Sequence, residues 1–346
     1  MKQTGIRNVF VGVIFGAMLL ITGCASSEGE QNSSANGQGQ GGPNSRQCES
    51  PKDLVRLKNV PIGVLMPAGS LERQSYTSAN DLVAAGLNAV SLGFEFYFTS
   101  TGEIVFDFNG NADEGAKEQW KNNLRCSVIE AKQAGLVVSV WGQFIEAGRR
   151  GEPGEVAPDV QTKVLDGALK LMPEVGKLLE ELQVEYWAPV SELERFAGVA
   201  NHNTYFPQFV AAGRPHFKGV MYVQPNILQR DGFVMQKIEP NLGGVDALGI
   251  SWISFECEAD KLPPGVSLES ADFYIEAGAK QGINRVFISE LGGTNATDES
   301  AKPCLEKLIT TWKGAENGVF LLDMPSDFPN GSQIKDSWQE DVLQAL

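Results

Sequence analysis

The chain has 346 residues, of which 42% are hydrophobic and 21% are charged, and these proportions are ordinary for a globular protein. They exclude a disordered chain and a protein with several membrane spans. With 28 basic and 43 acidic residues the formal net charge is -15. This argues against a nucleic acid as the main partner, because phosphate binding needs a positive surface.

The first 23 residues have the pattern of a secretory signal: Lys2 and Arg7, an apolar run over residues 9–21, and small residues before Cys24. The run is too short to span a bilayer comfortably. Residues 21–24, Ile-Thr-Gly-Cys, resemble the lipobox of bacterial lipoproteins, in which the chain is cut before the cysteine and the cysteine is acylated. The resemblance implies a lipid on Cys24 that anchors the protein to a membrane outside the cytoplasm, at the cell surface or outer membrane. An uncleaved anchor is the alternative.

Residues 24–50 contain mostly Ser, Gly, Asn, Gln and Glu, and such a segment is expected to form a flexible linker because it has little apolar surface to bury. Beyond Cys24 there are four cysteines, which allow one or two disulfides whose pairing the sequence leaves open. Their wide spacing fits no zinc motif, and the chain has only two histidines. We therefore expect no metal or other cofactor.

The remaining residues, 51–346, alternate between short apolar runs and longer amphipathic stretches. The runs are rich in strand-forming residues and lack polar alternation, as is typical of parallel strands covered on both faces. The eight runs are residues 62–66, 89–93, 137–141, 186–190, 219–223, 247–251, 285–289 and 318–322.

Several of the intervening helical stretches end on a glycine just before the next apolar run, as at Gly86, Gly135 and Gly282. This order of helix, glycine and strand suits right-handed crossovers between parallel strands. Eight such units predict a single-domain (β/α)8 TIM barrel. The alternative, an open doubly wound sheet, commonly has fewer strands and a glycine-rich phosphate turn after the first, which is absent here.

In such barrels the active site lies at the carboxyl ends of the strands. Two glutamates hold this position, Glu192 after the fourth run and Glu290 after the seventh. If strand alternation continues to both, Ala188 and Val190 face the barrel interior with Glu192, and Val286 and Ile288 face it with Glu290. Two carboxyl groups about 5 Å apart can carry out retaining glycoside hydrolysis: one attacks the anomeric carbon, and the other protonates the leaving oxygen. The charge of the first raises the pKa of the second.

The segments around the two glutamates resemble motifs of the clan A glycoside hydrolases, which include endo-β-1,4-mannanases and endo-β-1,4-galactanases. Residues 187–194, Trp-Ala-Pro-Val-Ser-Glu-Leu-Glu, resemble the fourth-strand acid/base motif. Residues 287–293, Phe-Ile-Ser-Glu-Leu-Gly-Gly, resemble the seventh-strand nucleophile motif. The resemblance implies that Glu192 is the acid/base and Glu290 is the nucleophile.

The sequence departs from this family at three positions. Ser191 replaces the Asn that precedes the acid/base, the second run lacks an Arg at its end, and Leu322 is followed by Asp323 where the family commonly has Trp. The Asn binds the 2-hydroxyl of the sugar in such enzymes, and the hydroxyl of Ser191 is a substitute. The residues expected to bind substrate at the strand ends are Glu95, Trp141, Gln143, Ser191, Gln224, Asn226, Trp252 and Asp323.

Each of these residues also has a purely structural interpretation. Glu192 suits the first turn of a helix, where acidic groups are favourable, and Glu290 suits an ion pair with Arg285 or Arg195. Trp141 and Trp252 suit packing between barrel and helices as well as a platform for a sugar ring.

The leading hypothesis is a lipid-anchored retaining glycoside hydrolase that cleaves a β-linked poly- or oligosaccharide. The second is a surface lipoprotein that binds a glycan but has lost turnover, which the missing Asn and Arg favour. The third is a metal-dependent barrel hydrolase, which the shortage of histidines disfavours.

Overall fold

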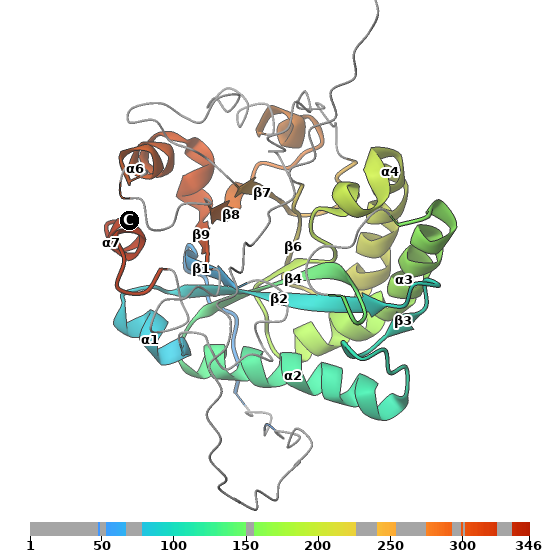
Figure 1. Ribbon diagram of the computed structural model, residues 1–346. Helices are drawn as coiled ribbons and strands as arrows, with labels where there is room; N and C mark the ends of the chain where they lie inside the picture. The colour runs from blue at the N-terminus through green and yellow to red at the C-terminus, as the bar shows by residue number, and fades with distance from the viewer. Residues whose placement is uncertain are drawn as a thin grey trace, which may run out of the picture. The chain divides into compact units, whose positions relative to one another are not determined.

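The computed structural model describes residue 48 and residues 53–66, 78–149, 156–225, 241–253, 275–292, 299, 302–323 and 334–346. Within these ranges eight parallel strands close into a barrel, because β1 pairs with both β9 and β2 (Figure 1). The chain is a (β/α)8 TIM barrel, as its sequence predicts. In chain order the barrel strands are β1 (Ile62–Met66), β2 (Ala89–Phe98), β4 (Val137–Glu146), β5 (Tyr186–Ala188), β6 (Val220–Val223), β7 (Ala247–Ile253), β8 (Val286–Gly292) and β9 (Val319–Leu322).

Two strands are longer than their apolar runs predict. β2 and β4 pair in register over ten residues, and the short strand β3 (Ile104–Val105) adds to β2 as an antiparallel neighbour. Glu95 and Gln143 therefore lie within strands and face each other in register, instead of following the strands. The additional residues of β2 and β4 satisfy their backbone hydrogen bonds by pairing with each other. This pairing lengthens the barrel wall on this side.

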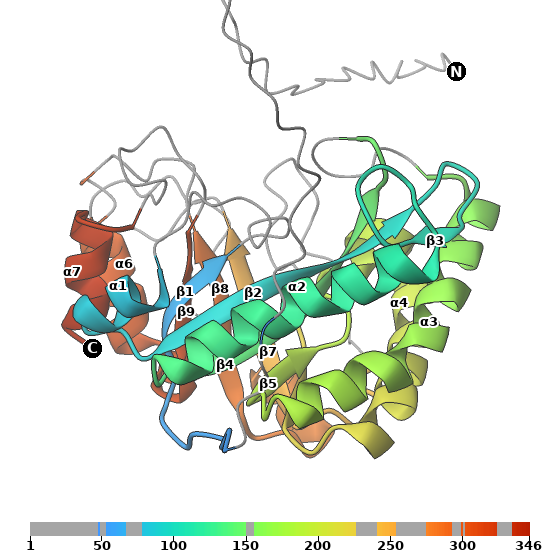
Figure 2. The same ribbon diagram turned by 90° about the horizontal axis from the view of Figure 1, so that it is seen from below.

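Helices surround the barrel, and α3 and α4 lie side by side on one flank (Figure 2). Asp113 caps α2 by accepting a hydrogen bond from the Ala116 backbone at 2.7 Å, and Pro158 occupies the first turn of α3, where its missing N–H is tolerated. The helices with described bounds are α1 (Ala79–Ala84), α2 (Glu114–Gln133), α3 (Pro158–Glu181), α4 (Leu193–Gly213), α6 (Lys302–Thr311) and α7 (Trp338–Gln344).

The strands separate two hydrophobic cores. The larger core fills the space between strands and helices. The smaller core lies inside the barrel and takes at least one side chain from each of the eight strands. Its members are Leu65, Ala89, Val137, Trp141, Tyr186, Ala188, Tyr222, Ala247, Phe287 and Phe320. Membership of one core or the other therefore shows which way a strand residue points.

Strand β8 contains a bulge that reverses this pattern near its end. Val286, Ile288 and Leu291 belong to the outer core, while Phe287 belongs to the inner one. The pairing with β7 steps from Ile250 opposite Ile288 to Ser251 opposite Glu290, so Ser289 is an extra residue in β8. A bulge of this kind re-aims the side chain that follows it. The expectation that Val286 and Ile288 fill the interior is wrong, because the bulge turns Glu290 to the face opposite theirs.

Strand β5 also departs from the expected alternation of its side chains. Ala188 faces the interior as expected, but Val190 packs in the outer core. The regular strand ends at Ala188, so alternation no longer fixes the direction of residues beyond it.

The chain that precedes β1 is fastened to the barrel at the end opposite the carboxyl ends of its strands. The backbone N–H of Leu57 donates to Glu185 at 2.6 Å, and its side chain packs against the inner core. Glu185 also accepts from the Val138 backbone at 2.8 Å and forms a buried ion pair with Lys132. Leu57 therefore closes the amino-terminal end of the barrel.

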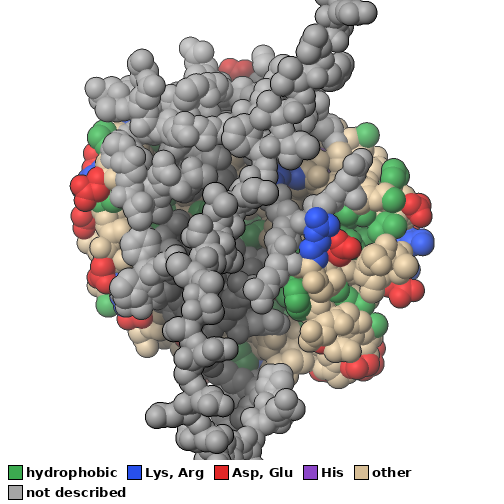
Figure 3. Space-filling model, viewed as in Figure 1, with side chains coloured by type: hydrophobic (Ala, Val, Ile, Leu, Met, Phe, Trp, Pro, Cys, Tyr) green, Lys and Arg blue, Asp and Glu red, His purple; other side chains and the backbone are tan. Residues whose placement is uncertain are grey.

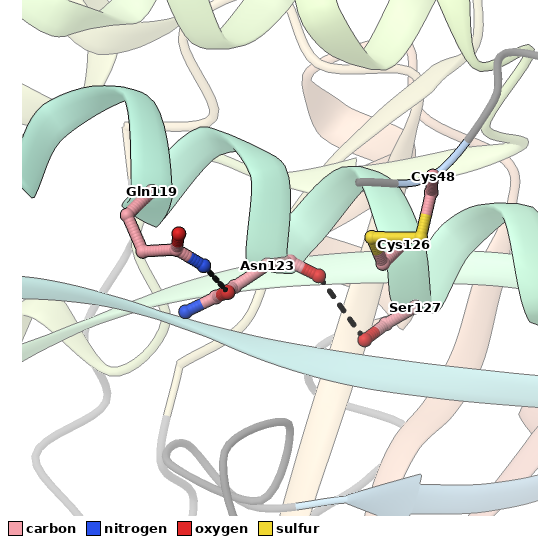
Figure 4. Close-up of a disulfide and its surroundings, with 5 residues drawn as sticks. All are labelled: Cys48, Gln119, Asn123, Cys126 and Ser127. Carbon is pink, nitrogen blue, oxygen red and sulfur yellow. Dashed lines mark hydrogen bonds between the residues drawn. A yellow bond between two sulfur atoms is a disulfide. The ribbon is translucent and has the colours of Figure 1, made fainter. Parts of the chain in front are cut away.

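A disulfide joins Cys48 to the buried Cys126 of α2 (Figure 4). Asn123, one turn earlier, accepts from Gln119 at 2.6 Å through its side chain and from Ser127 at 3.2 Å through its carbonyl. This pairing is one of the possibilities that the cysteine count leaves open. The bond closes a loop across 78 positions of sequence.

We predict that replacing both Cys48 and Cys126 by Ser lowers the free energy of unfolding by about 2–4 kcal/mol, because the open loop gives the unfolded chain more conformations. Denaturant unfolding measures the difference. Reduction of the unmodified protein is expected to produce the same loss, and reduction of the double variant no further loss. Equal stability of the oxidised protein and the variant would contradict the prediction.

The bulge depends on space that Gly249 in β7 leaves open. A Cβ at this position would lie 2.7 Å from the Ser289 Cβ and 2.7 Å from the ring of Tyr222. We predict that Gly249→Ala destabilises the fold by about 1–3 kcal/mol through overpacking. The control is Gly115→Ala at the exposed start of α2, where alanine is expected to be neutral or slightly stabilising. Equal unfolding free energies for the two variants would show that the interior accommodates the extra carbon.

Candidate active site

Glu290 lies in the mouth of the barrel, directly after the β8 bulge. Its side chain is buried, with 6% of its surface exposed. Its Oε2 accepts hydrogen bonds from Gln224 Nε2 at 2.9 Å and from Ser251 Oγ at 2.8 Å, and both donors are uncharged. Arg285 donates instead to the hydroxyl of Tyr186, so the ion-pair interpretation of Glu290 with Arg285 does not hold.

Glu192 follows β5 and is the N-cap residue of α4, but its side chain does not cap the helix. Its Oε1 accepts from Ser251 Oγ at 2.8 Å, and its Oε2 accepts from Arg195 at 2.8 Å. The residue begins a helix, as the structural interpretation expects, while its carboxylate is turned toward Glu290.

The backbone of Glu192 is held in a left-handed conformation, with φ 48° and ψ 39°. For a residue other than glycine this costs of the order of 1–3 kcal/mol and persists only where the surroundings enforce it. Two hydrogen bonds do so: the Glu192 N–H donates to the Gln224 carbonyl at 2.7 Å, and the Ser191 N–H donates to the Gly142 carbonyl at 2.8 Å. These two hydrogen bonds hold the backbone of Glu192 in the left-handed conformation, and this determines the direction of its carboxylate.

Ser251 links the two glutamates. Its buried hydroxyl lies 2.8 Å from Glu192 Oε1 and 2.8 Å from Glu290 Oε2, so these two oxygens are at most twice that distance apart. Carboxyl groups are about 5–5.5 Å apart in retaining glycosidases and about 6.5–9.5 Å apart in inverting ones. The geometry matches the retaining class.

The electrostatics place a proton on this pair. Burial, with the nearby charge of Glu192, raises the pKa of Glu290 to about 8, while the hydrogen bond from Ser251 and the charge of Arg195 act in the opposite direction. Burial and the neighbouring carboxylate thus favour the neutral form of Glu290.

Other residues predicted to bind substrate are also close to this pair. Gln224 is fully buried at the end of β6 and contacts Glu290 directly. Ser191 is buried beside Glu192, and its backbone bridges to Gln224. Trp141 is 5% exposed and belongs to the inner core, so it fills the barrel interior and does not pack between barrel and helices.

Glu95 and Gln143 lie beside each other on β2 and β4. Glu95 is buried, and its backbone carbonyl accepts from the indole of Trp120 at 2.8 Å. Gln143 is partly exposed.

Asp323 is not brought to the carboxyl pair. It lies on the outer side of the barrel, where it lines a cavity of about 220 Å³ together with residues of α1 and α7. Its register explains this position, because Phe320 faces the interior and Leu321 the outer core, so the position two beyond Leu321 also faces outward. Cys24 and Asn226 lie outside the described residues, and so does the side chain of Trp252.

Ser251 is a site residue that the sequence motifs do not reveal, although its position on β7 gives one signal. Ala247 and Gly249 face the barrel interior, so Ser251 is the next inward position on β7 and the last before the mouth. A polar residue there is a candidate for the site by alternation alone.

The histidine nearest to this region in the sequence does not join the pair. His202 of α4 is 1% exposed and stacked on Phe206, and its Nδ1 lies 3.5 Å from Glu194 Oε2. Burial lowers the pKa of His202 to about 4, so it is neutral at pH 7. Among the residues that the structure describes, no cluster of three or more His, Cys, Asp or Glu is placed to hold a metal ion.

On the face shown in Figure 3, the described acidic and basic side chains are scattered over the surface and do not gather in one patch of a single sign. Within the described part of the chain, no helix is both long and apolar enough to cross a membrane.

No protein-family model and no curated protein sequence matches the chain. Several solved structures do match its fold. The β-mannanase AaManA of family GH113 from Alicyclobacillus acidocaldarius superposes with a TM-score of 0.53 at 15% identity, covering 83% of this chain and 96% of the other. A glycoside hydrolase family 5 enzyme from Prevotella bryantii gives a TM-score of 0.55 at 15% identity, covering 82% and 94%. The endocellulase from Pyrococcus horikoshii gives 0.51 at 12% identity, covering 83% and 92%.

The (β/α)8 fold of the chain is similar to the folds of these glycoside hydrolases. The similarity covers more than four fifths of the chain. At this level of identity the comparison establishes the architecture, and the chemistry has to be argued from the carboxyl pair itself.

The raised pKa of Glu290 predicts a specific pH dependence of stability. In the unfolded chain Glu290 releases its proton near pH 4.5, while the folded protein keeps it up to about pH 8. Between these values the folded state binds more protons, so rising pH destabilises it by up to about 1.4 kcal/mol per pH unit. The stabilising contribution is thus complete below pH 4.5 and is lost as pH approaches 8.

We therefore predict that Glu290→Gln becomes progressively more stable relative to the unmodified protein as pH rises from 5 to 8. Denaturant unfolding at several pH values measures the difference in unfolding free energy between the two proteins. The control Ser289→Ala alters the same bulge without removing a titrating group, and its difference from the unmodified protein is expected to be independent of pH. Parallel stability curves for Glu290→Gln and the unmodified protein would show that Glu290 titrates normally.

Proposed function

We propose that this protein is a retaining β-glycoside hydrolase in which Glu290 is the nucleophile and Glu192 is the general acid and base. The observation that carries the proposal is the separation of the two carboxyl groups, which one serine hydroxyl bridges with two 2.8 Å contacts. Their placement after the fourth and seventh barrel strands supports the assignment, as does the fold shared with β-mannanases and cellulases.

The proposed reaction has two steps. Glu290 attacks the anomeric carbon while Glu192 protonates the leaving oxygen, which gives a covalent glycosyl-enzyme. Glu192 then removes a proton from water, which attacks the same carbon and releases the sugar with retention of configuration. Arg195 contacts the outer oxygen of Glu192 and stabilises its charged form between these steps.

The proposed substrate is a β-1,4-linked glycan of the mannan or glucan type, the class named for the structural neighbours. The proposed location is outside the cytoplasm, with a lipid on Cys24 as the membrane anchor. Both follow from resemblance: the first from the fold, and the second from residues 21–24.

We predict that Glu290→Ala lowers hydrolysis of β-mannan and β-glucan oligosaccharides to below about one thousandth, because no nucleophile remains. Glu192→Ala is expected to lose about 10²–10⁴-fold on the same substrates, the usual contribution of a general acid. It should lose much less on aryl glycosides with an activated leaving group, which needs no protonation. Azide should restore part of its turnover and give the β-glycosyl azide, identified by NMR.

The control for this series is Glu181→Gln at the end of α3, where the exposed carboxylate pairs with Arg125, and it is expected to keep full activity. Turnover by Glu290→Ala equal to that of the unmodified protein would contradict the assignment. Initial release of the α-anomer would contradict the retaining mechanism.

The second candidate function is glycan binding without turnover. It is favoured by Ser191, which stands where the related acid/base motif has Asn, and by the absence of an Arg at the end of the second apolar run. Glycan binding detected by calorimetry, with no reducing ends released from any substrate in the series, would support this candidate.

A further inference from the structure

The side chain of Gln224 turns into the mouth of the barrel at the end of β6. Tyr222 belongs to the inner core and Val223 to the outer core, so alternation directs the next residue inward. The Nε2 of Gln224 donates a hydrogen bond to Glu290 Oε2 at 2.9 Å. Gln224 thus lies against the carboxyl group to which the proposed function gives the role of nucleophile.

The oxygen of this amide group has no hydrogen-bond donor within the part of the chain that the structure describes. Gln224 is fully buried, and a buried amide oxygen without a donor is both costly and uncommon in native proteins. The contact with Glu290 explains the orientation of the amide. An ionised carboxylate only accepts hydrogen bonds, so it takes the N–H side of the amide and leaves Oε1 for another donor.

The chemistry of the proposed intermediate indicates which donor this is. The anomeric carbon is bonded to Glu290 in the glycosyl-enzyme, so the two ring positions that flank this carbon lie beside the carboxyl group. One of them is the ring oxygen, which has no proton to donate. The other carries the 2-hydroxyl, which has one. An acceptor beside Glu290 therefore suits the 2-hydroxyl of the bound sugar.

The end of the neighbouring strand leaves this role open. The related acid/base motif has an Asn that binds the 2-hydroxyl, and Ser191 stands at that position here. Ser191 and Gln224 form a bridge across the ends of β5 and β6, so the two positions are adjacent. Gln224 thus supplies, from the next strand, the same amide group that Ser191 lacks.

The backbone of Gln224 is held as well as its side chain. Its carbonyl accepts from the Glu192 N–H at 2.7 Å, while its side chain donates to Glu290. Contacts with both glutamates therefore fix the position of the amide before a sugar binds. A preorganised acceptor of this kind favours a hydroxyl of one orientation over a hydroxyl of another.

We propose that Gln224 is a specificity-determining residue, whose amide contacts the nucleophile through Nε2 and accepts a hydrogen bond from the 2-hydroxyl of the bound sugar through Oε1. The proposal rests on the proposed function and deepens it. Mannose and glucose units differ only in the orientation of this hydroxyl. Gln224 thereby selects between the mannan and the glucan type of substrate.

The first test compares three aryl β-glycosides that share one activated leaving group: the mannoside, the glucoside and the 2-deoxy glycoside that is common to both. For the unmodified protein we expect kcat/KM to be higher for one epimer than for the other by about tenfold or more. Gln224→Met keeps the length of the side chain but lacks both polar atoms. We expect it to lower the preference between the epimers, and the advantage of the preferred epimer over the 2-deoxy glycoside, by about tenfold each.

These ratios separate recognition of the hydroxyl from a structural effect. The lost contact with Glu290, or a general defect in packing, lowers the rates on all three glycosides alike. The intrinsic reactivity of the 2-deoxy glycoside cancels when the same ratio is compared between two proteins. Gln208→Met makes the matched replacement on the exposed side of α4 and is expected to keep all three rates.

Ser191→Ala tests the alternative that the neighbouring hydroxyl binds the 2-hydroxyl. Ratios that collapse in Ser191→Ala and persist in Gln224→Met would overturn the proposal and assign the contact to Ser191. An unmodified protein that hydrolyses both epimers and the 2-deoxy glycoside equally well would also overturn it.

If the unmodified protein hydrolyses none of the three glycosides, the proposed function fails, and calorimetry then decides whether Gln224 recognises the hydroxyl. The probes are mannobiose and cellobiose, each measured beside the form that lacks the 2-hydroxyl on its reducing unit. The proposal predicts that the unmodified protein binds the 2-deoxy form of the preferred disaccharide more weakly, and that Gln224→Met binds both forms equally. Equal binding of both forms to the unmodified protein, or no binding of any probe, would refute it.

Discussion

Strand β8 has to send Ile288 toward the helices and Glu290 into the barrel mouth, although these residues are two positions apart. In a regular strand such residues face the same side. The chain resolves the conflict with one extra residue, Ser289, and with Gly249 on β7, which leaves room for the Ser289 side chain. The hydrogen bonds of Glu290 to Gln224 and Ser251 both depend on this local change of direction.

The site is maintained at a cost in stability. Glu192 is held in a left-handed backbone conformation, and Glu290 is an acid in a place that disfavours its charge. Proteins commonly accept such costs where function requires a fixed geometry. The compensation here is the packing of two separate cores, one inside the barrel and one outside it, which together hold all eight strands.

Much of the fold could be predicted from the sequence, because parallel strands buried on both faces leave continuous apolar runs such as residues 62–66 and 137–141. Glu192 and Glu290 could be selected because both follow such runs, and the structure brings them together. The directions of Val190, Val286 and Ile288 were predicted wrongly, since a bulge and an early strand end leave no mark on an apolar run. Ser251 was missed because its role depends on lying opposite Glu290, and only the pairing of β7 with β8 determines that register.

The attachments of Cys48, Arg56 and Leu57 determine how the fold would respond to mechanical tension. A pull on the chain from its amino-terminal side would reach α2 first, through the bond between Cys48 and Cys126. The contacts of Arg56 with Glu180 and of Leu57 with Glu185 would bear it only after that bond was reduced. Strand β1 begins at Ile62, after both attachments in the sequence. A pull would therefore reach its pairing with β2 and β9 only after both attachments had given way. The barrel seam is thus shielded from shear for as long as the disulfide is oxidised.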